Sequence, residues 1–91
     1  MQKIGDKMQP KDILIENIDS VHTTEMGVGR ISRNLDIAED VVEYCKTKIL
    51  KSESKVERKG KNYYVENDDC IITVNASSYT IITAHKKSKK K

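Results

Sequence analysis

The spacing of apolar residues changes once along the chain, and this change constrains the fold more than any other feature. Up to about residue 50, apolar residues recur at intervals of three and four, which predicts helices. Beyond Ser54 they alternate with polar residues in short runs, which predicts strands. Because a parallel sheet requires the two kinds of element to alternate, helices followed by strands indicate an α+β fold with an antiparallel sheet.

About three helices are expected before the strands, over residues 10–20, 24–34 and 36–51. Pro10 can begin the first helix, and Thr23 or Thr24 can cap the second. Asp36 with Glu39 forms a variant of the capping box that opens the third. We expect these helices to cover one face of the sheet.

Four strands follow, over residues 55–59, 62–66, 70–75 and 79–85, and the short polar turns between them predict a four-stranded antiparallel meander. Alternation turns the apolar side chains of the middle strands toward the helices: Tyr63, Val65, Cys70, Ile72 and Val74. The last strand leaves the choice of face open. If Thr80, Ile82 and Ala84 face the helices, the open face carries the hydrogen-bonding groups Asn62, Tyr64, Glu66, Thr73, Asn75, Tyr79, Thr83 and His85.

With 91 residues and 36% hydrophobic content, the chain suffices for one small domain. We expect a single α+β domain over residues 1–85 and a Lys-rich flexible tail over residues 86–91. No apolar run approaches the roughly 18 residues of a membrane span, and the first residues lack the apolar core of a signal peptide. The sequence therefore predicts a cytoplasmic protein that does not bind membranes.

Cationic residues are concentrated in two stretches. The net charge is +3, and five lysines lie within residues 86–91. Residues 46–61 carry seven cationic and two acidic side chains. Because phosphate contacts dominate affinity for nucleic acids, this segregation suits RNA as a partner. The alternative is that the lysines only keep a small protein soluble.

The two cysteines, Cys45 and Cys70, have no metal-ligand spacing and lie in a predicted helix and a predicted strand. Without an export signal a disulfide is not expected, so both are interpreted as core residues. The acidic residues also lack the periodicity of a metal site. Neither a metal nor another cofactor is predicted.

The chain has two histidines, His22 after the first helix and His85 at the end of the last strand. Histidine titrates near neutral pH, and two suffice for one acid and one base. A metal-independent ribonuclease needs such a pair and a cation that stabilises the phosphorane. The candidate cations are Arg30, Arg33, Arg58 and Lys61, and Arg58 is the one assigned to catalysis. The alternative interpretation is that each histidine only ends its helix or strand.

The predicted hairpin over residues 58–64, RKGKNYY, combines three cations with two tyrosines. This mixture suits phosphate contact and base stacking. The predicted substrate-binding residues are Arg30, Lys61, Tyr64, Tyr79 and Thr83. The alternative is a lysine-rich turn that aids solubility, with one tyrosine ring in the core and one at the surface.

Four segments carry a resemblance: VHTTEMG (residues 21–27), RISRNL (30–35), RKGKNYY (58–64) and ITVNASSYTIITAH (72–85). Together they resemble a family of short bacterial and phage proteins classed as a domain of unknown function, over about residues 13–87. The closing stretch through His85 is the most specific part. This resemblance implies no activity.

More remotely, the layout resembles the barnase, EndoU, colicin-tRNase and RelE-like nuclease superfamily, whose members are largely metal-independent ribonucleases and often toxins. The resemblance rests on a histidine after the first helix, an arginine-bearing second helix and a meander that ends in IITAH. It implies His22 as base or acid, Arg30 or Arg58 with Lys61 as phosphate ligands, and three groups on the sheet: Tyr79, Thr83 and His85.

We therefore expect a domain that engages RNA, with cleavage through attack of the 2′-hydroxyl, in the setting of a toxin or a conflict between phage and host. The alternative is a non-catalytic binding module of a phage or mobile element that inhibits a host protein or sequesters a nucleotide. A third hypothesis is a homodimer that forms through exposed strand edges. Fold analogy alone does not decide between them.

Overall fold

The chain folds as helices followed by a four-stranded antiparallel sheet, which confirms the α+β prediction. The computed structural model describes residues 9–87. The helical elements are α1 (Pro10–Glu16), the 3₁₀ turn η2 (Ile18–Ser20), α2 (Glu25–Leu35) and α3 (Val41–Leu50). The strands are β1 (Lys55–Lys59), β2 (Asn62–Glu66), β3 (Cys70–Asn75) and β4 (Ile81–Lys86).

The two longest helices, α2 and α3, begin where a side chain accepts a hydrogen bond from a free backbone N–H group. The side chain of Thr24 accepts from Gly27 N at 3.0 Å and begins α2. The carboxylate of Asp40 accepts from Glu43 N at 3.1 Å and begins α3. The prediction that Asp36 opens the third helix is wrong, because Asp36 ends α2 in the left-handed conformation, with φ 59°.

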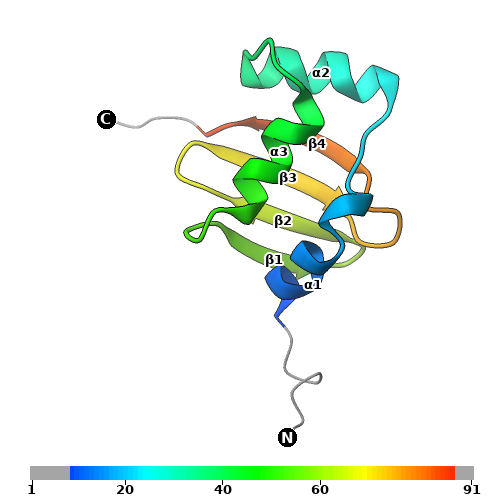
Figure 1. The fold of residues 1–91 in the computed structure, drawn as a ribbon, viewed down its shortest axis with the longest axis vertical. Helices are drawn as coiled ribbons and strands as arrows, with labels where there is room; N and C mark the ends of the chain where they lie inside the picture. The colour runs from blue at the N-terminus through cyan, green and yellow to red at the C-terminus, as the bar shows by residue number, and fades with distance from the viewer. Residues whose placement is uncertain (1–8, 88–91) are drawn as a thin grey trace, which may run out of the picture.

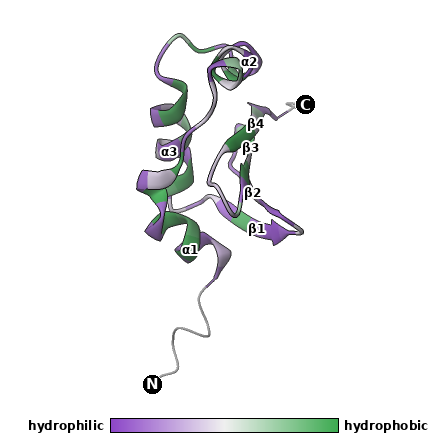
Figure 2. Cartoon of the chain, turned by 90° about the vertical axis from the view of Figure 1, so that its right-hand side faces the viewer, coloured by the Kyte–Doolittle hydropathy of each residue, from purple (hydrophilic) through white to green (hydrophobic). Residues whose placement is uncertain are grey.

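The sheet is a meander in the order β1-β2-β3-β4, and the helices lie on one side of it. Figure 2 shows α1 and α3 against one face, while the opposite face of the strands is bare. Figure 1 shows α2 beyond β4, and α2 packs on that strand. The core lies between these layers, and its largest fully buried side chains are Leu14, Ile31, Leu35, Ile49, Ile72 and Ile81.

The predicted faces of the middle strands are confirmed. Tyr63 and Val65 on β2 are buried in the core. The alternating residues of β3 join them there: Cys70, Ile72 and Val74. Alternation fixed these positions because both strands are fully paired on each side.

A bulge changes the faces of β4. Thr73 pairs with Thr83 and Val74 pairs with Ile81, so Ile82 has no partner residue on β3. Ile81 is consequently buried, whereas Ile82 is 41% exposed. The grouping of Ile82 with the inward-facing residues is therefore wrong.

The strand also ends later than expected. Lys86 belongs to β4, and Lys87 N donates to Asp69 O at 3.0 Å. These two lysines are thus part of the described fold, although the sequence placed them in the tail. The remainder of the predicted tail, residues 88–91, lies outside the described residues.

Both cysteines are buried and unpaired, which confirms their assignment to the core. Burial raises the pKa of the Cys45 thiol to about 12 and that of Cys70 to about 11. Within residues 9–87, no helix combines the length and the apolar character that crossing a membrane requires.

Candidate functional site

Two turns and one histidine meet at one end of the sheet, on the right in Figure 1. The turn between β1 and β2 lies beside the turn between β3 and β4, because Ala76 N donates to Lys61 O at 2.8 Å. His22 joins them through an isolated parallel bridge with Thr80. We call this region the turn end, defined as Gly60, Lys61, His22 and residues 75–80.

The backbone of His22 is held against the start of β4. His22 N donates to Tyr79 O at 3.1 Å, and Ile81 N donates to His22 O at 2.6 Å. The hydroxyl of Thr23 donates to Ile81 O at 2.9 Å. The segment between η2 and α2 therefore extends the sheet by a short parallel bridge, and the position of His22 is set by the sheet.

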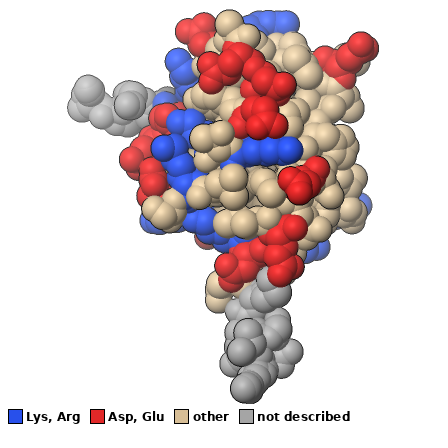
Figure 3. Space-filling model, in the orientation of Figure 1, with Lys and Arg blue, Asp and Glu red and all other residues tan. Residues whose placement is uncertain are grey.

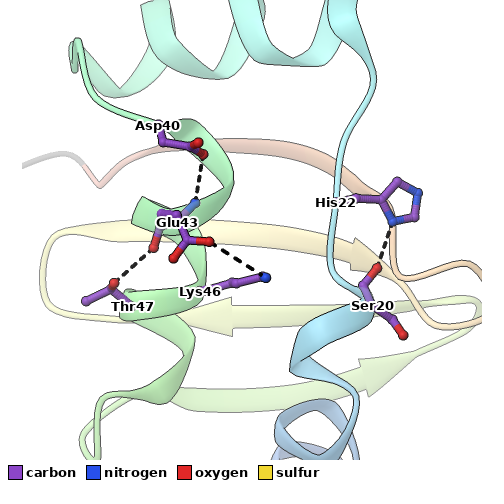
Figure 4. A network of polar contacts seen from close by, with 6 residues as sticks. All are labelled: Ser20, His22, Asp40, Glu43, Lys46 and Thr47. Carbon is purple, nitrogen blue, oxygen red and sulfur yellow. Dashed lines mark hydrogen bonds and ion pairs between the residues drawn. The ribbon is translucent and has the colours of Figure 1, made fainter.

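The ring of His22 has a defined orientation. Nδ1 lies 2.7 Å from Ser20 O, as Figure 4 shows, and Nε2 lies 3.2 Å from Thr80 Oγ1. A carbonyl oxygen only accepts, so Nδ1 carries the proton of the neutral ring. Nε2 is consequently left as the acceptor, which is the state that a general base requires.

The turn after β3 presents a row of hydroxyl groups. Asn75 Oδ1 accepts from the backbone N–H groups of Ser77 and Ser78, each at 2.9 Å. Ser78 Oγ lies 2.7 Å from Thr80 Oγ1. The turn thereby aligns Ser78 and Thr80 with Nε2 of His22.

Tyr79 completes the turn in an unusual conformation, with φ 61°. The left-handed region costs a residue with a side chain roughly 1–2 kcal/mol. Hydrogen bonds on both sides hold it there, from Tyr79 N to Asn75 O at 2.9 Å and from His22 N to Tyr79 O at 3.1 Å. The backbone of Tyr79 is thus a fixed link between the hydroxyl groups and the histidine.

The Tyr79 ring packs against the core, so its predicted place on the open face is wrong. It stacks on Tyr63, with ring centroids 6.4 Å apart, and the Arg58 guanidinium lies 5.6 Å from the Tyr63 ring. Burial raises the pKa of the Tyr79 hydroxyl, and Tyr63 raises it further. The left-handed backbone of Tyr79 is the physical reason for this inward turn.

Several predicted site residues therefore lie in one region. His22, Lys61 and Tyr79 belong to the turn end, and the stacked tyrosines connect Arg58 to it. Arg58 Nε donates to Gly60 O at 2.8 Å, which holds the guanidinium beside the turn.

The structure does not bring His85 to His22. His85 lies near the far end of β4, opposite Ile71, and is exposed. At about 3.3 Å per strand residue, it is roughly 15 Å along the strand from Thr80. At that separation the two histidines cannot act as acid and base on the same phosphodiester.

The remaining predicted substrate residues are also dispersed. Tyr64 and Thr83 both pair with Thr73, which places them in one row across the open face of the sheet. Arg30 is exposed on α2. These residues are accessible, but in the described part of the chain their side chains form no hydrogen bond or ion pair with the turn end.

The hydroxyl partners of His22 were not identified from the sequence. Ser78 and Thr80 could be recognised as hydrogen-bonding groups, but nothing local connects them with a histidine. Thr80 and His22 are 58 positions apart in the chain. Only the pairing of the sheet with the segment before α2 brings them together.

The helical side of the molecule offers a different surface. Seen from that side, acidic side chains gather over the connection from α2 to α3 and the first turn of α3 (Figure 3), where Glu39, Asp40 and Glu43 lie. A neighbouring groove of about 480 Å³ contains Tyr44, Asp69 and Lys87. Two of its charges are paired, since Asp69 binds Lys48 and Lys87 binds Glu66, each at 2.8 Å.

No set of three potential ligands for a metal ion occurs in the part of the chain that the structure describes. The turn end itself supplies hydroxyl, imidazole and amide groups and contains no carboxylate. Its chemistry is that of hydrogen bonding and proton transfer.

A comparison with family models matches residues 15–85 to the protein family of unknown function DUF3781. No curated protein and no solved structure shows significant similarity to the chain. The resemblance to the ribonuclease superfamily, like the suggested phage origin, stays a prediction. The match covers most of the chain, including α2, α3 and the whole meander up to His85, and the chain therefore belongs to the DUF3781 family.

Proposed function

We propose that the turn end binds RNA and that His22 receives the proton of a ribose 2′-hydroxyl in a cleavage reaction that needs no metal. One observation carries this proposal: a histidine with its Nε2 held as an acceptor lies in the same region as cationic and hydroxyl side chains. Phosphate contact and proton abstraction are the two requirements of such a reaction.

Arg58 and Lys61 fit the first requirement. Lys61 lies in the β1–β2 turn, and Arg58 lies near the end of β1 just before it. Arg58 is held there because its Nε donates to Gly60 O at 2.8 Å. A guanidinium forms paired hydrogen bonds with phosphate oxygens and stabilises the charge that develops on phosphorus. The exposed ring of Tyr64 lies on the opposite face of the same hairpin, because Arg58 pairs with the buried Tyr63, and it offers a separate stacking surface for a base.

The test uses purified protein and total RNA in the presence of EDTA. Wild type is expected to produce discrete fragments with 2′,3′-cyclic phosphate ends. His22→Ala should abolish these fragments while binding of a fluorescent RNA oligonucleotide persists. His85→Ala is the matched control, because its side chain lies at the far end of β4, and it should cleave like wild type.

Loss of cleavage in His85→Ala with full activity in His22→Ala would contradict the assignment of the base. Failure of wild type to bind any RNA would contradict the whole proposal. Expression of wild type, but not of His22→Ala, should arrest bacterial growth if the reaction serves as a toxin. The proposed setting is the cytoplasm.

A second candidate function is a non-catalytic binding module, which inhibits a host protein or sequesters a nucleotide. The separation of His85 from His22 favours it, because the turn end then lacks a second histidine as the acid. RNA or nucleotide binding by wild type and by His22→Ala, without cleavage by either, would identify this function.

A further inference from the structure

The contacts at the turn end form a continuous chain of hydrogen bonds. Ser78 Oγ lies 2.7 Å from Thr80 Oγ1, and Thr80 Oγ1 lies 3.2 Å from His22 Nε2. In the neutral ring Nε2 accepts, so the Thr80 hydroxyl must donate to it. Because the Thr80 hydroxyl has only one proton, it must accept from Ser78. Both hydrogen bonds therefore point from Ser78 toward the imidazole.

The same atoms can reverse this direction. When His22 is protonated, Nε2 donates to Thr80, Thr80 donates to Ser78, and Ser78 needs another acceptor. Asn75 Oδ1 supplies it, at 3.2 Å from Ser78 Oγ. Each charge state of the imidazole thus leaves every hydroxyl of the chain with a partner.

The three groups differ in their access to a substrate. Ser78 and His22 are exposed, whereas Thr80 is half-buried between them. His22 Nε2 is already engaged by the Thr80 hydroxyl, so a substrate hydroxyl that leaves this hydrogen bond intact reaches the imidazole through Ser78. The geometry of the chain therefore separates the group that touches the substrate from the group that stores the proton.

We propose that Ser78 is the catalytic residue that contacts the reacting 2′-hydroxyl, and that Thr80 passes the proton on to His22. The inference rests on the proposed function of the turn end. The 2′-hydroxyl proton moves to Ser78, that of Ser78 moves to Thr80, and that of Thr80 moves to His22 Nε2. The 2′-oxygen forms a bond to phosphorus, the bond from phosphorus to the 5′-oxygen breaks, and the leaving oxygen takes a proton from water.

The first measurement is the tautomer of His22, read from the ¹⁵N shifts of its ring in wild-type protein at alkaline pH, where histidine rings are neutral. The Nδ1–H form is expected, and the exposed ring of His85 serves as internal reference. Thr80→Val, which keeps the shape of the side chain, should move the Nε2 resonance of His22, and Thr80→Ser should restore it. A wild-type Nε2–H form would overturn the relay whatever the result with RNA.

The second measurement is the rate of RNA cleavage by the same proteins. Ser78→Ala and Thr80→Val should lower kcat about 100-fold, the usual contribution of acid–base catalysis, with little change in KM. Thr80→Ser should recover most of the rate. Ser52→Ala is the matched control at an exposed serine outside the turn end, between α3 and β1, and it should behave like wild type. Thermal midpoints near that of wild type would show that each variant folds.

The two measurements separate the possible failures. Undiminished cleavage by Ser78→Ala and Thr80→Val would overturn the relay and leave the proposed function standing. The expected tautomer without RNA cleavage by wild type would overturn the proposed function, and with it the role of Ser78 toward a 2′-hydroxyl. Loss of activity in Thr80→Val that Thr80→Ser does not recover would also count against a hydroxyl relay.

Discussion

His22 and Thr80 lie side by side in a parallel bridge, with His22 Nε2 3.2 Å from Thr80 Oγ1, although 58 positions separate them in the sequence. The bridge is made of backbone hydrogen bonds on either side of the imidazole. These bonds hold the backbone of His22 against the start of β4. The stability of the turn end and its chemistry therefore depend on the same few contacts.

Gly27→Ala should destabilise the protein by about 1–3 kcal/mol, as overpacking of a buried site does. Gly27 is buried in α2, and an added Cβ would collide with the Thr23 hydroxyl, which donates to Ile81 O at 2.9 Å. Gly29→Ala is the matched control, because nothing lies near its added Cβ, and it should stabilise α2 by about 1 kcal/mol. Urea denaturation measures both, and equal effects would contradict the prediction.

The ion pair between Asp69 and Lys48 should contribute to stability at neutral pH and lose that contribution in acid. The hydrogen bond from Lys48, with Nζ 2.8 Å from Oδ2, lowers the pKa of the Asp69 carboxyl. A carboxyl with a lowered pKa stabilises the fold above its unfolded value of about 3.9, and this stabilisation disappears as the pH falls through the folded value.

Asp69→Asn should therefore lower the thermal midpoint at about pH 7 and have little effect well below pH 3. Asp68→Asn, at the neighbouring exposed acid, is the control for the change of charge. A pH dependence of Asp69→Asn that matches wild type would show that the pair does not contribute.

Both cysteines should resist thiol reagents in the folded protein. Burial raises the pKa of Cys45 to about 12 and that of Cys70 to about 11, so the reactive thiolate is scarce at about pH 8. A colorimetric thiol reagent is expected to modify neither cysteine in buffer and both in urea. Rapid modification of the native protein would contradict the burial of these side chains.

Lys61→Ala should weaken RNA binding if the turn end contacts phosphate. The slope of the logarithm of affinity against the logarithm of salt concentration should decrease by about one for each lost contact. Lys46→Ala is the control, because Lys46 lies on α3, outside the turn end. Its Nζ is 3.8 Å from Glu43 Oε2. Fluorescence anisotropy at several salt concentrations measures the slope, and equal slopes for the two variants would exclude Lys61 from the interface.

The sequence correctly predicted those parts of the fold in which a regular alternation of apolar and polar residues sets which side chains are buried. Tyr63 and Val65 alternate with polar neighbours, and their burial follows from that pattern. Ile81 and Ile82 stand next to each other, and a bulge decides which is buried. Pattern alone contains no information on such a bulge, because it depends on the register with β3.

The candidate site was predictable only in part, for a similar reason. Local composition identified Arg58 and Lys61, since cations and aromatics are concentrated in one hairpin. Joining His22 with Thr80 required the tertiary arrangement of segments from opposite halves of the chain. His85 illustrates the same limit, because two histidines in a sequence give no measure of the distance between them, and the structure places His85 far along β4 from His22.

The bridge between His22 and Thr80 also sets when the site can exist during synthesis. A chain emerges from the ribosome with its N-terminal part first, so the helices and His22 leave long before the turn after β3. Until that turn has emerged, the imidazole has no hydroxyl partner from Thr80. The nascent chain therefore lacks the pairing of His22 with Thr80 until the turn before the last strand has emerged and docked against the segment before α2.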